Sequence, residues 1–299
     1  GIYAKDSDLY LNGVNINLHG DNSLGLYLNG NTNLQTGNGI INIDGQNVVL
    51  FNMDTASGTT INNNFSISST VGSTYTIGNI SQSTFTYAGN SNLTSDGTFI
   101  SGKNSAVYLD GAYITSSSGS VNTAAIALDG QFSGMLPAGM TANTDGENNG
   151  NISLGDSSVG VYGKNGSRLS NKGIITVGNN SAALMTSGTG ALAENTGMIN
   201  IGAGSQGMVV KDGINVKNIT GAISGTETGS VGIFADNITG TIENGGLINL
   251  NGNKAIGVYS VGSNAVLINN NPGAEIKIGD SSDSLDPSIG IYSSAVGST

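Results

Sequence analysis

Apolar and polar residues alternate in short runs along most of the chain. Leu26 and Leu28 share one face of such a run, and Ile199 and Ile201 share one face of another. Side chains at positions i and i+2 lie on the same side of a β-strand, so this period of two predicts strands with one buried face. The runs end in Asn-Gly or a similar pair, which accepts the positive φ of a tight turn. The pattern therefore predicts many short strands joined by turns.

The runs recur at a regular interval, marked by aromatic residues. Tyr3, Tyr27, Phe51 and Tyr75 lie 24 residues apart in succession. A related motif, S-x-G-[IV]-[YF], returns at 158–162, 230–234 and 288–292, and the motif N-x-G-x-I-x-[IVL] returns at 195–201 and 244–250. One unit of this length cannot bury its apolar side chains, but a parallel stack of units can. The spacing predicts an all-β, right-handed parallel β-helix with three short strands per coil of about 24 residues and roughly a dozen coils.

The repeat extends over the whole chain, so we predict that residues 1–299 are a single β-helical segment of a longer protein. Insertions interrupt the rhythm near 76–92, at 130–150 and at 280–287. Residues 130–150 leave the repeat altogether and are expected to protrude as a loop. Insertions in repeat proteins gather on one face and often carry binding, although drift in a tolerant turn gives the same irregularity.

Composition agrees with strands and turns and narrows the choice of partner. Glycine supplies 48 of the 299 residues, whereas average domains contain about 7% glycine. Charged residues make up 10% of the chain, whereas they make up about 25% of average domains. The formal net charge is −11 without any basic run. Nucleic acid and anionic membrane surfaces need clustered Lys and Arg, so neither is expected as a partner. Cysteine is absent, so an exported form would gain its stability from something other than disulfides.

Candidate catalytic residues are few. His19 is the single histidine and falls at a turn, where we interpret it as a solvated residue and not as part of a Ser-His-Asp site. Zinc sites need clustered His or Cys, and no metal or other cofactor is expected. Calcium is left open at Asp280, Asp283 and Asp286, which stand three residues apart in one loop, although Asp is also a common turn residue.

The aromatic residues provide the main candidates for binding. Strand alternation places Leu24, Leu26 and Leu28 on one face, expected to be inside, and Tyr27 on the other. We expect Phe51 and the later Tyr and Phe residues to continue an outward row, which either receives a ligand or only stabilises the sheet by stacking. Candidate binding residues come from this row and from the 130–150 loop: Tyr27, Tyr108, Tyr162, Phe234, Tyr259, Phe132, Met135 and Leu136, with Tyr292 at the end of the row.

The degenerate 24-residue units with S-x-G-[IV]-[YF] and N-x-G-x-I-x-[IVL] strands resemble the passenger regions of large Gram-negative autotransporter adhesins, over nearly the whole chain. The resemblance lies in repeat style and composition and involves no catalytic motif. It implies an extracellular β-helix at the bacterial surface, anchored through an outer-membrane β-barrel that would follow at the C-terminus of the full-length chain. It implies a non-catalytic adhesin, acting as a monomer in virulence and binding a protein or glycan receptor on host cells or on other bacteria.

Two alternatives remain open at this point. β-Helices also serve as polysaccharide hydrolases and lyases, and a hydrolase would place at least two carboxylates about 5–10 Å apart in one cleft. The segment could also be a passive stalk that projects a distal binding tip.

Overall fold

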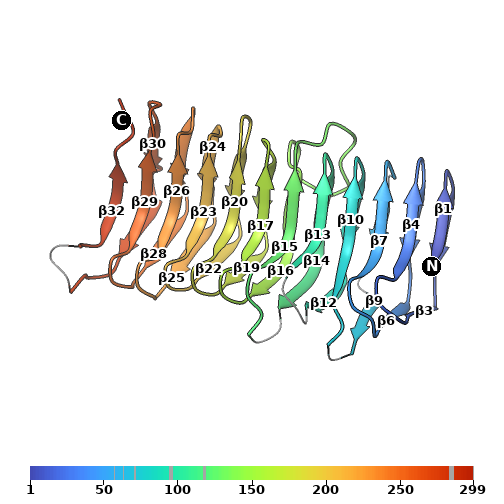
Figure 1. Ribbon diagram of the computed structural model, residues 1–299. Coiled ribbons are helices and arrows are strands. Elements are labelled where there is room, and N and C mark those ends of the chain that lie inside the picture. The colour runs from blue at the N-terminus through green and yellow to red at the C-terminus, as the bar shows by residue number, and fades with distance from the viewer. Residues whose placement is uncertain are drawn as a thin grey trace.

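The computed structural model describes residues 1–298 except 57, 63, 71, 94–96, 117–118 and 283–285. The described chain forms β-strands and no helix. It therefore holds no helical segment long and apolar enough to cross a membrane. Figure 1 shows strands of successive coils side by side along a rod, with the two termini at opposite ends. The predicted parallel β-helix with three strands per coil is confirmed.

The first face of the rod is one continuous parallel sheet. Its strands are short because each coil turns away after four to seven residues. The described residues place twelve strands in it, in the order β1 (Ile2–Lys5), β4 (Leu24–Asn29), β7 (Val48–Asp54), β10 (Tyr75–Ser81), β13 (Gly97–Lys103), β15 (Thr123–Asp129), β17 (Val159–Lys164), β20 (Ala182–Ser187), β23 (Gln206–Lys211), β26 (Val231–Asp236), β29 (Ile256–Val261) and β32 (Ile289–Ser293).

The second face follows the first in each coil and pairs in the same parallel manner. Two longer strands, β14 (Ala106–Ser116) and β16 (Gly146–Leu154), run through both the second and the third face. The other strands of the second face are β2 (Asp8–Leu11), β5 (Asn33–Thr36), β8 (Thr59–Ile61), β11 (Thr84–Tyr87), β18 (Arg168–Asn171), β21 (Leu192–Asn195), β24 (Asn215–Asn218), β27 (Thr241–Asn244) and β30 (Leu267–Asn270).

The third face closes each coil and returns the chain to the first face. Its strands are β3 (Val14–Leu18), β6 (Gly39–Ile43), β9 (Phe65–Ser69), β12 (Asn90–Leu93), β19 (Ile174–Val177), β22 (Met198–Ile201), β25 (Ala222–Gly225), β28 (Leu247–Leu250) and β31 (Glu275–Ile278).

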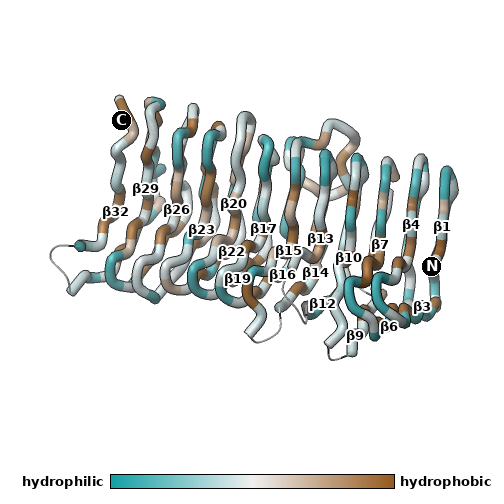
Figure 2. The backbone as a smooth tube through the Cα atoms, viewed as in Figure 1, coloured by the Kyte–Doolittle hydropathy of each residue, from teal (hydrophilic) through white to brown (hydrophobic). Residues whose placement is uncertain are grey.

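The core is a set of apolar rows that run along the rod. On the third face one inward position is isoleucine in six successive coils, all almost completely buried: Ile114, Ile152, Ile175, Ile199, Ile223 and Ile248. Burying each such side chain stabilises the fold by roughly 1.5–3 kcal/mol. Figure 2 shows apolar segments recurring within the strands of successive coils. β-Branched residues suit these positions because they pack well on a pleated sheet.

Asparagines fill the corner between the second and third faces. The side-chain amide of each donates to the side-chain oxygen of the next over five steps of 2.7–2.9 Å. This asparagine ladder consists of Asn148, Asn171, Asn195, Asn218, Asn244 and Asn270. Most of its members are buried, where a polar group needs a partner. The ladder explains the N-x-G motif, because its asparagine ends the second-face strand and the following glycine lies in the turn.

The predicted insertions differ in outcome. Residues 76–92 are not an insertion, because they lie in β10, β11, β12 and the short turns between them. Residues 130–145 leave the strands, whereas 146–150 belong to β16. Of the segment 280–287, residues 283–285 lie outside the described part of the chain, and the others form no strand.

Candidate binding groove

One outward position of the first face can be followed from end to end through the strand register. Its members form what we call the outward row: Tyr3, Tyr27, Asn52, Asn79, Ser101, Ala127, Tyr162, Met185, Val209, Phe234, Tyr259 and Tyr292.

Aromatic rings contact one another where aromatic residues are adjacent in the outward row, stacked at one end and tilted at the other. The ring centroids of Tyr3 and Tyr27 are 5.5 Å apart, with the rings nearly parallel. At the other end Tyr259 lies 5.4 Å from Phe234 and 5.1 Å from Tyr292. Tyr27, Tyr162, Phe234 and Tyr259 are partly exposed, so the outward facing predicted for them is confirmed.

Four residues do not occupy the positions predicted for them. Phe51 is fully buried, because Asn52 is the register partner of Tyr27 and Phe51 therefore faces inward. Tyr75 is also buried and pairs with Val48 near the start of its strand. Tyr108 is 4% exposed and lies in β14, on the second face. Leu24 was expected inside but is 39% exposed. The residue between Leu24 and Leu26 has no register partner on the next strand.

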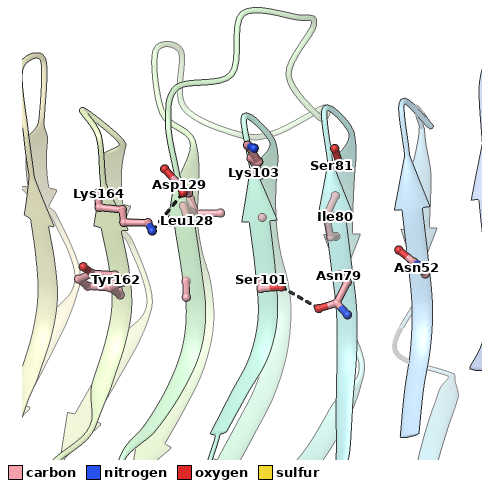
Figure 3. Close-up of a pocket in the computed structure, with 12 residues that line it drawn as sticks. Asn52, Asn79, Ile80, Ser81, Ser101, Lys103, Leu128, Asp129, Tyr162 and Lys164 are labelled. Atoms are coloured by element: carbon pink, nitrogen blue, oxygen red, sulfur yellow. Dashed lines mark hydrogen bonds and ion pairs between the residues drawn. The ribbon is translucent and has the colours of Figure 1, made fainter. Parts of the chain in front are cut away.

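The outward row is interrupted in the middle, where small and polar residues replace the large ones. Between Tyr27 and Tyr162 it consists of Asn52, Asn79, Ser101 and Ala127. A groove of about 420 Å³ opens at this place (Figure 3). Its lining comprises Asn52, Asn79, Ile80, Ser81, Ser101, Gly102, Lys103, Ala127, Leu128, Asp129, Tyr162 and Lys164.

The upper rim of the groove is charged. Lys103, Asp129 and Lys164 each end a first-face strand and are register partners in that order. Asp129 Oδ2 pairs with Lys164 Nζ at 3.1 Å, and Asp129 Oδ1 accepts a 2.5 Å hydrogen bond from Asn165 Nδ2. These contacts, with the Asn165 hydrogen bond as the largest cause, hold the pKa of Asp129 below its ordinary value. Lys103 forms no ion pair within the described residues.

The floor of the groove offers hydrogen-bonding groups. Ser101 Oγ donates to Asn79 Oδ1 at 2.7 Å, which leaves the amide N–H groups of Asn79 directed at no protein acceptor in the described chain. Tyr162 bounds one end of the groove, next to Ala127 in the register. Because alanine covers little of its ring, Tyr162 lines this end of the groove. The arrangement combines an aromatic wall, amide and hydroxyl groups and a cationic rim.

The charged residues do not form an obvious catalytic or metal site. Among the residues lining the groove, Asp129 is the single carboxylate. In the parts of the chain that the structure describes, no three His, Cys, Asp or Glu side chains come together as metal ligands would. Of the three aspartates at which calcium was left open, Asp286 pairs with Lys254 at 2.9 Å, whereas Asp283 lies outside the described residues. His19 is exposed, and its Nδ1 lies 2.5 Å from Asp44 Oδ2 of the next coil.

The loop at 130–145 rises above the rim of the groove and is clamped by two buried carboxylates. Asp145 accepts hydrogen bonds from the Phe132 N–H at 2.8 Å and from the Arg168 N–H at 2.7 Å. The Arg168 guanidinium donates to both Asp145 oxygens, at 2.8 and 3.0 Å, and these bonds raise the pKa of Arg168. Glu147 accepts from the Thr141 N–H at 2.9 Å and pairs with Lys172 at 2.8 Å. Figure 1 shows this loop standing out near β13 and β15.

The loop carries the other three candidate residues. Met135 is 90% exposed, while Phe132 and Leu136 are partly buried. A second depression of about 530 Å³ lies between the loop and the corner of the preceding coils, where Phe132 and Met135 face Thr55, Gln82 and Asn104. The structure thus brings Phe132, Met135 and Leu136 together, separately from the outward row. Tyr108 lies beneath this loop, with its hydroxyl near Gly139.

Five residues that line the groove are not among the candidates that the sequence pattern predicts: Asn79, Ser101, Lys103, Asp129 and Lys164. A signal for them exists at the corner that follows each first-face strand. The residue there has positive φ in every coil from the first to the eleventh, for example 48° at Asn104 and 53° at Asn165. Alignment on this corner instead of on the aromatic motif places Ser101, Ala127 and Tyr162 in one column.

Comparison with known proteins gives no assignment. No family model, no curated protein and no solved structure matches the chain.

Proposed function

We propose that this chain is a segment of an extracellular adhesin that holds a surface ligand in the first-face groove without any chemical step. The observation that carries this proposal is the interruption of the outward row. Four successive coils replace large side chains by Asn, Ser and Ala, and this opens a groove that Tyr162 bounds at one end. Met185 and Val209 also lack rings, but they keep apolar side chains in the row. A row needed only for stacking has no reason to lose its large side chains in the four coils beside an inserted loop.

The chemistry of the groove favours binding over catalysis. Hydrolysis of a glycosidic bond uses two carboxylates facing one another across the substrate. Asp129 is the one carboxylate among the described lining residues, and both of its oxygens are already engaged. Its lowered pKa makes it a poor general acid near neutral pH, because such an acid needs a raised pKa.

The clamped loop also supports a binding role. Asp145 and Glu147 are completely buried and satisfy backbone N–H groups of the loop, so the loop is held in a definite shape above the groove. Ligand-binding residues are commonly found on loops that a rigid scaffold positions. We propose a protein or glycan receptor on a host or bacterial cell as the partner, and we retain from the repeat resemblance the expectation of a monomeric autotransporter passenger at a Gram-negative cell surface.

The test fills the groove without changing the backbone. Ala127→Tyr restores a ring at the missing position beside Tyr162, at the spacing that Tyr3 and Tyr27 already show. The matched control is Ala222→Tyr, a partly exposed outward alanine of the third face. Labelled wild-type and variant chains are incubated with host epithelial cells and with bacterial cells, and retained protein is measured.

We expect the wild-type chain and Ala222→Tyr to adhere equally and Ala127→Tyr to lose most adhesion while unfolding at an unchanged denaturant concentration. Equal adhesion of Ala127→Tyr would show that the groove is not the binding site. Absence of adhesion by the wild-type chain to any cell type would overturn the adhesive function and favour a passive stalk.

A further inference from the structure

We infer that the groove takes an acidic sugar, a pyranose ring that carries a carboxylate or a sulfate. The ring lies against Tyr162 over Ala127 and Ser101, and its anionic group contacts the ammonium of Lys103. This inference rests on the proposed binding function of the groove and adds the class of ligand.

The size of the ligand follows from the interrupted row. Where aromatic residues are adjacent in the row, their centroids lie 5.1–5.5 Å apart. Ala127 is the register neighbour of Tyr162. The position directly beside the Tyr162 ring therefore lacks a ring. A six-membered sugar ring has nearly the size of a phenol ring and an apolar C–H face. Bound there, it replaces the missing ring and stacks on Tyr162 as an apolar surface does on an aromatic one.

The hydroxyl groups of a sugar fit the floor. Ser101 and Asn79 are one and two coils further along the row from Ala127, and the Asn79 amide is oriented by its bond from Ser101 Oγ. Its N–H groups remain free to donate to sugar oxygens, while the Ser101 oxygen remains able to accept. Such paired donors and acceptors suit vicinal hydroxyls and do not suit an apolar peptide side chain.

The charge of the ligand follows from the rim. Residues two apart on a strand lie on the same side, so Lys103 stands above Ser101 and Asp129 stands above Ala127. Asp129 would repel an anion, but its two oxygens are engaged by Lys164 and Asn165. Lys103 has no carboxylate within ion-pair distance in the described chain. Lys103 still interacts electrostatically with Asp129 and contributes to the lowered pKa of that carboxyl. Two lysines of the rim, Lys103 and Lys164, nevertheless face the one carboxylate of Asp129. In a chain with a formal net charge of −11, this local excess of positive charge over a sugar-sized gap favours an anionic substituent.

The experiment compares matched oligosaccharides by calorimetric titration of the 299-residue chain. The probes are a tetrasaccharide of galacturonic acid, its uncharged methyl ester, and a sulfated and an unmodified galactose tetrasaccharide. The variants are Lys103→Gln, Tyr162→Ala and the control Lys211→Gln. Lys211 also ends a first-face strand, but in its coil Val209 occupies the outward position.

We expect an acidic probe to bind roughly tenfold tighter than its neutral counterpart at low salt, since hydrogen bonds to charged groups are about twice as strong as neutral ones. Lys103→Gln should remove this preference, Lys211→Gln should leave it, and Tyr162→Ala should weaken every probe. The preference should also decline as salt is raised, because the rim is exposed and screened. The uronate and sulfate arms show which anion the groove prefers.

Equal binding of acidic and neutral probes would overturn the inference while leaving sugar binding intact. If no sugar binds but the chain still adheres to cells and Ala127→Tyr abolishes that adhesion, the ligand is a protein. In that case the inference fails and the proposed function stands. If the wild-type chain adhered to no cell type, the proposed function itself would be refuted.

Discussion

Removing one rung from the middle of the asparagine ladder should destabilise the rod far more than removing its last rung. The Asn195 side chain is fully buried. Its Nδ2 donates to Asn218 Oδ1 at 2.9 Å, and its Oδ1 accepts from Asn171 Nδ2 at 2.8 Å. Asn195→Ala removes both ladder bonds, at about 1 kcal/mol each, together with a longer 3.3 Å bond from Asn195 Nδ2 to the Gly197 carbonyl. It also leaves Asn218 Oδ1 with no donor among the described residues, which costs about 1 kcal/mol more.

The expected loss for Asn195→Ala is therefore about 3 kcal/mol of unfolding free energy. Asn270 provides the matched control, because it ends the ladder, is exposed and accepts one ladder bond from Asn244. Water can replace that bond, so Asn270→Ala should cost no more than about 1 kcal/mol. Urea titration followed by circular dichroism measures both losses. Hydrogen exchange then shows whether protection is lost locally, as expected where each coil contacts only its neighbours.

A double variant separates the ladder from general packing. In Asn195→Ala with Asn218→Ala, the oxygen left without a donor in the single variant is removed too. The double loss should consequently be smaller than the sum of the two single losses. Strict additivity, or a loss for Asn195→Ala no larger than that for Asn270→Ala, would refute the view that the ladder itself stabilises the rod.

Three further outcomes are expected. Asp145→Asn leaves the partly buried Arg168 guanidinium without its carboxylate and should cost about 3 kcal/mol. Proteinase K should then cleave within 131–144 much faster, and an unchanged cleavage rate would contradict the clamp. Ser205→Ala removes a 2.8 Å bond to a carbonyl and a 3.0 Å bond from a backbone N–H of the preceding coil, which should lower stability by about 2 kcal/mol in the same urea titration. The pKa of Asp129 is lowered from 3.8 in the folded state, so its stabilising contribution is complete above pH 3.8 and is lost as pH falls through the lowered value. Carboxyl titration by NMR should show this pKa rising in Asn165→Gly, and an unmoved pKa would contradict the assigned cause.

The overall fold could be predicted from the sequence because the period and the alternation are both local properties. Ile199 and Ile201 lie on the same strand, and no knowledge of distant contacts is needed to place them on one face. Every coil repeats this information, so errors in single coils do not change the architecture. The same holds for Tyr162, Phe234 and Tyr259, each of which ends a local [IV]-G-[IV]-[YF] motif and takes the outward position predicted for it.

Register could not be predicted where coil length changes. Phe51 lies 24 residues after Tyr27, but the coil is one residue longer, and a shift of one residue turns a side chain from one face to the other. Tyr108 was misplaced for a different reason. Serines precede strands at two corners of the coil, and Ser105 belongs to the corner before the second face, where it accepts from the Ser83 N–H. A motif that begins with serine therefore fits either corner.

The groove was harder to predict because it forms where the outward row has no large side chains. Ala127 and Ser101 carry no signal of their own, and their meaning appears only once Tyr162 is known to be their neighbour in the stack. Lys103 and Asp129 are likewise ordinary turn-side residues until the register makes them adjacent. Sites built from different coils depend on contacts between residues distant in sequence, and a periodicity defines those contacts only when every coil has the same length.

A solenoid can gain a site by substitution without changing its backbone, since each coil supplies the same position and smaller side chains simply leave space. That route explains the groove: β13 and β15 keep the regular pairing of the first face while their outward residues shrink to Ser101 and Ala127. The second change, the 130–145 loop, starts directly after β15. It packs against the corner of the coils that include Gln82 and Asn104, which contribute β10 and β13 to the groove. Two independent departures from the repeat thus fall on the same coils, as the proposed ligand site requires.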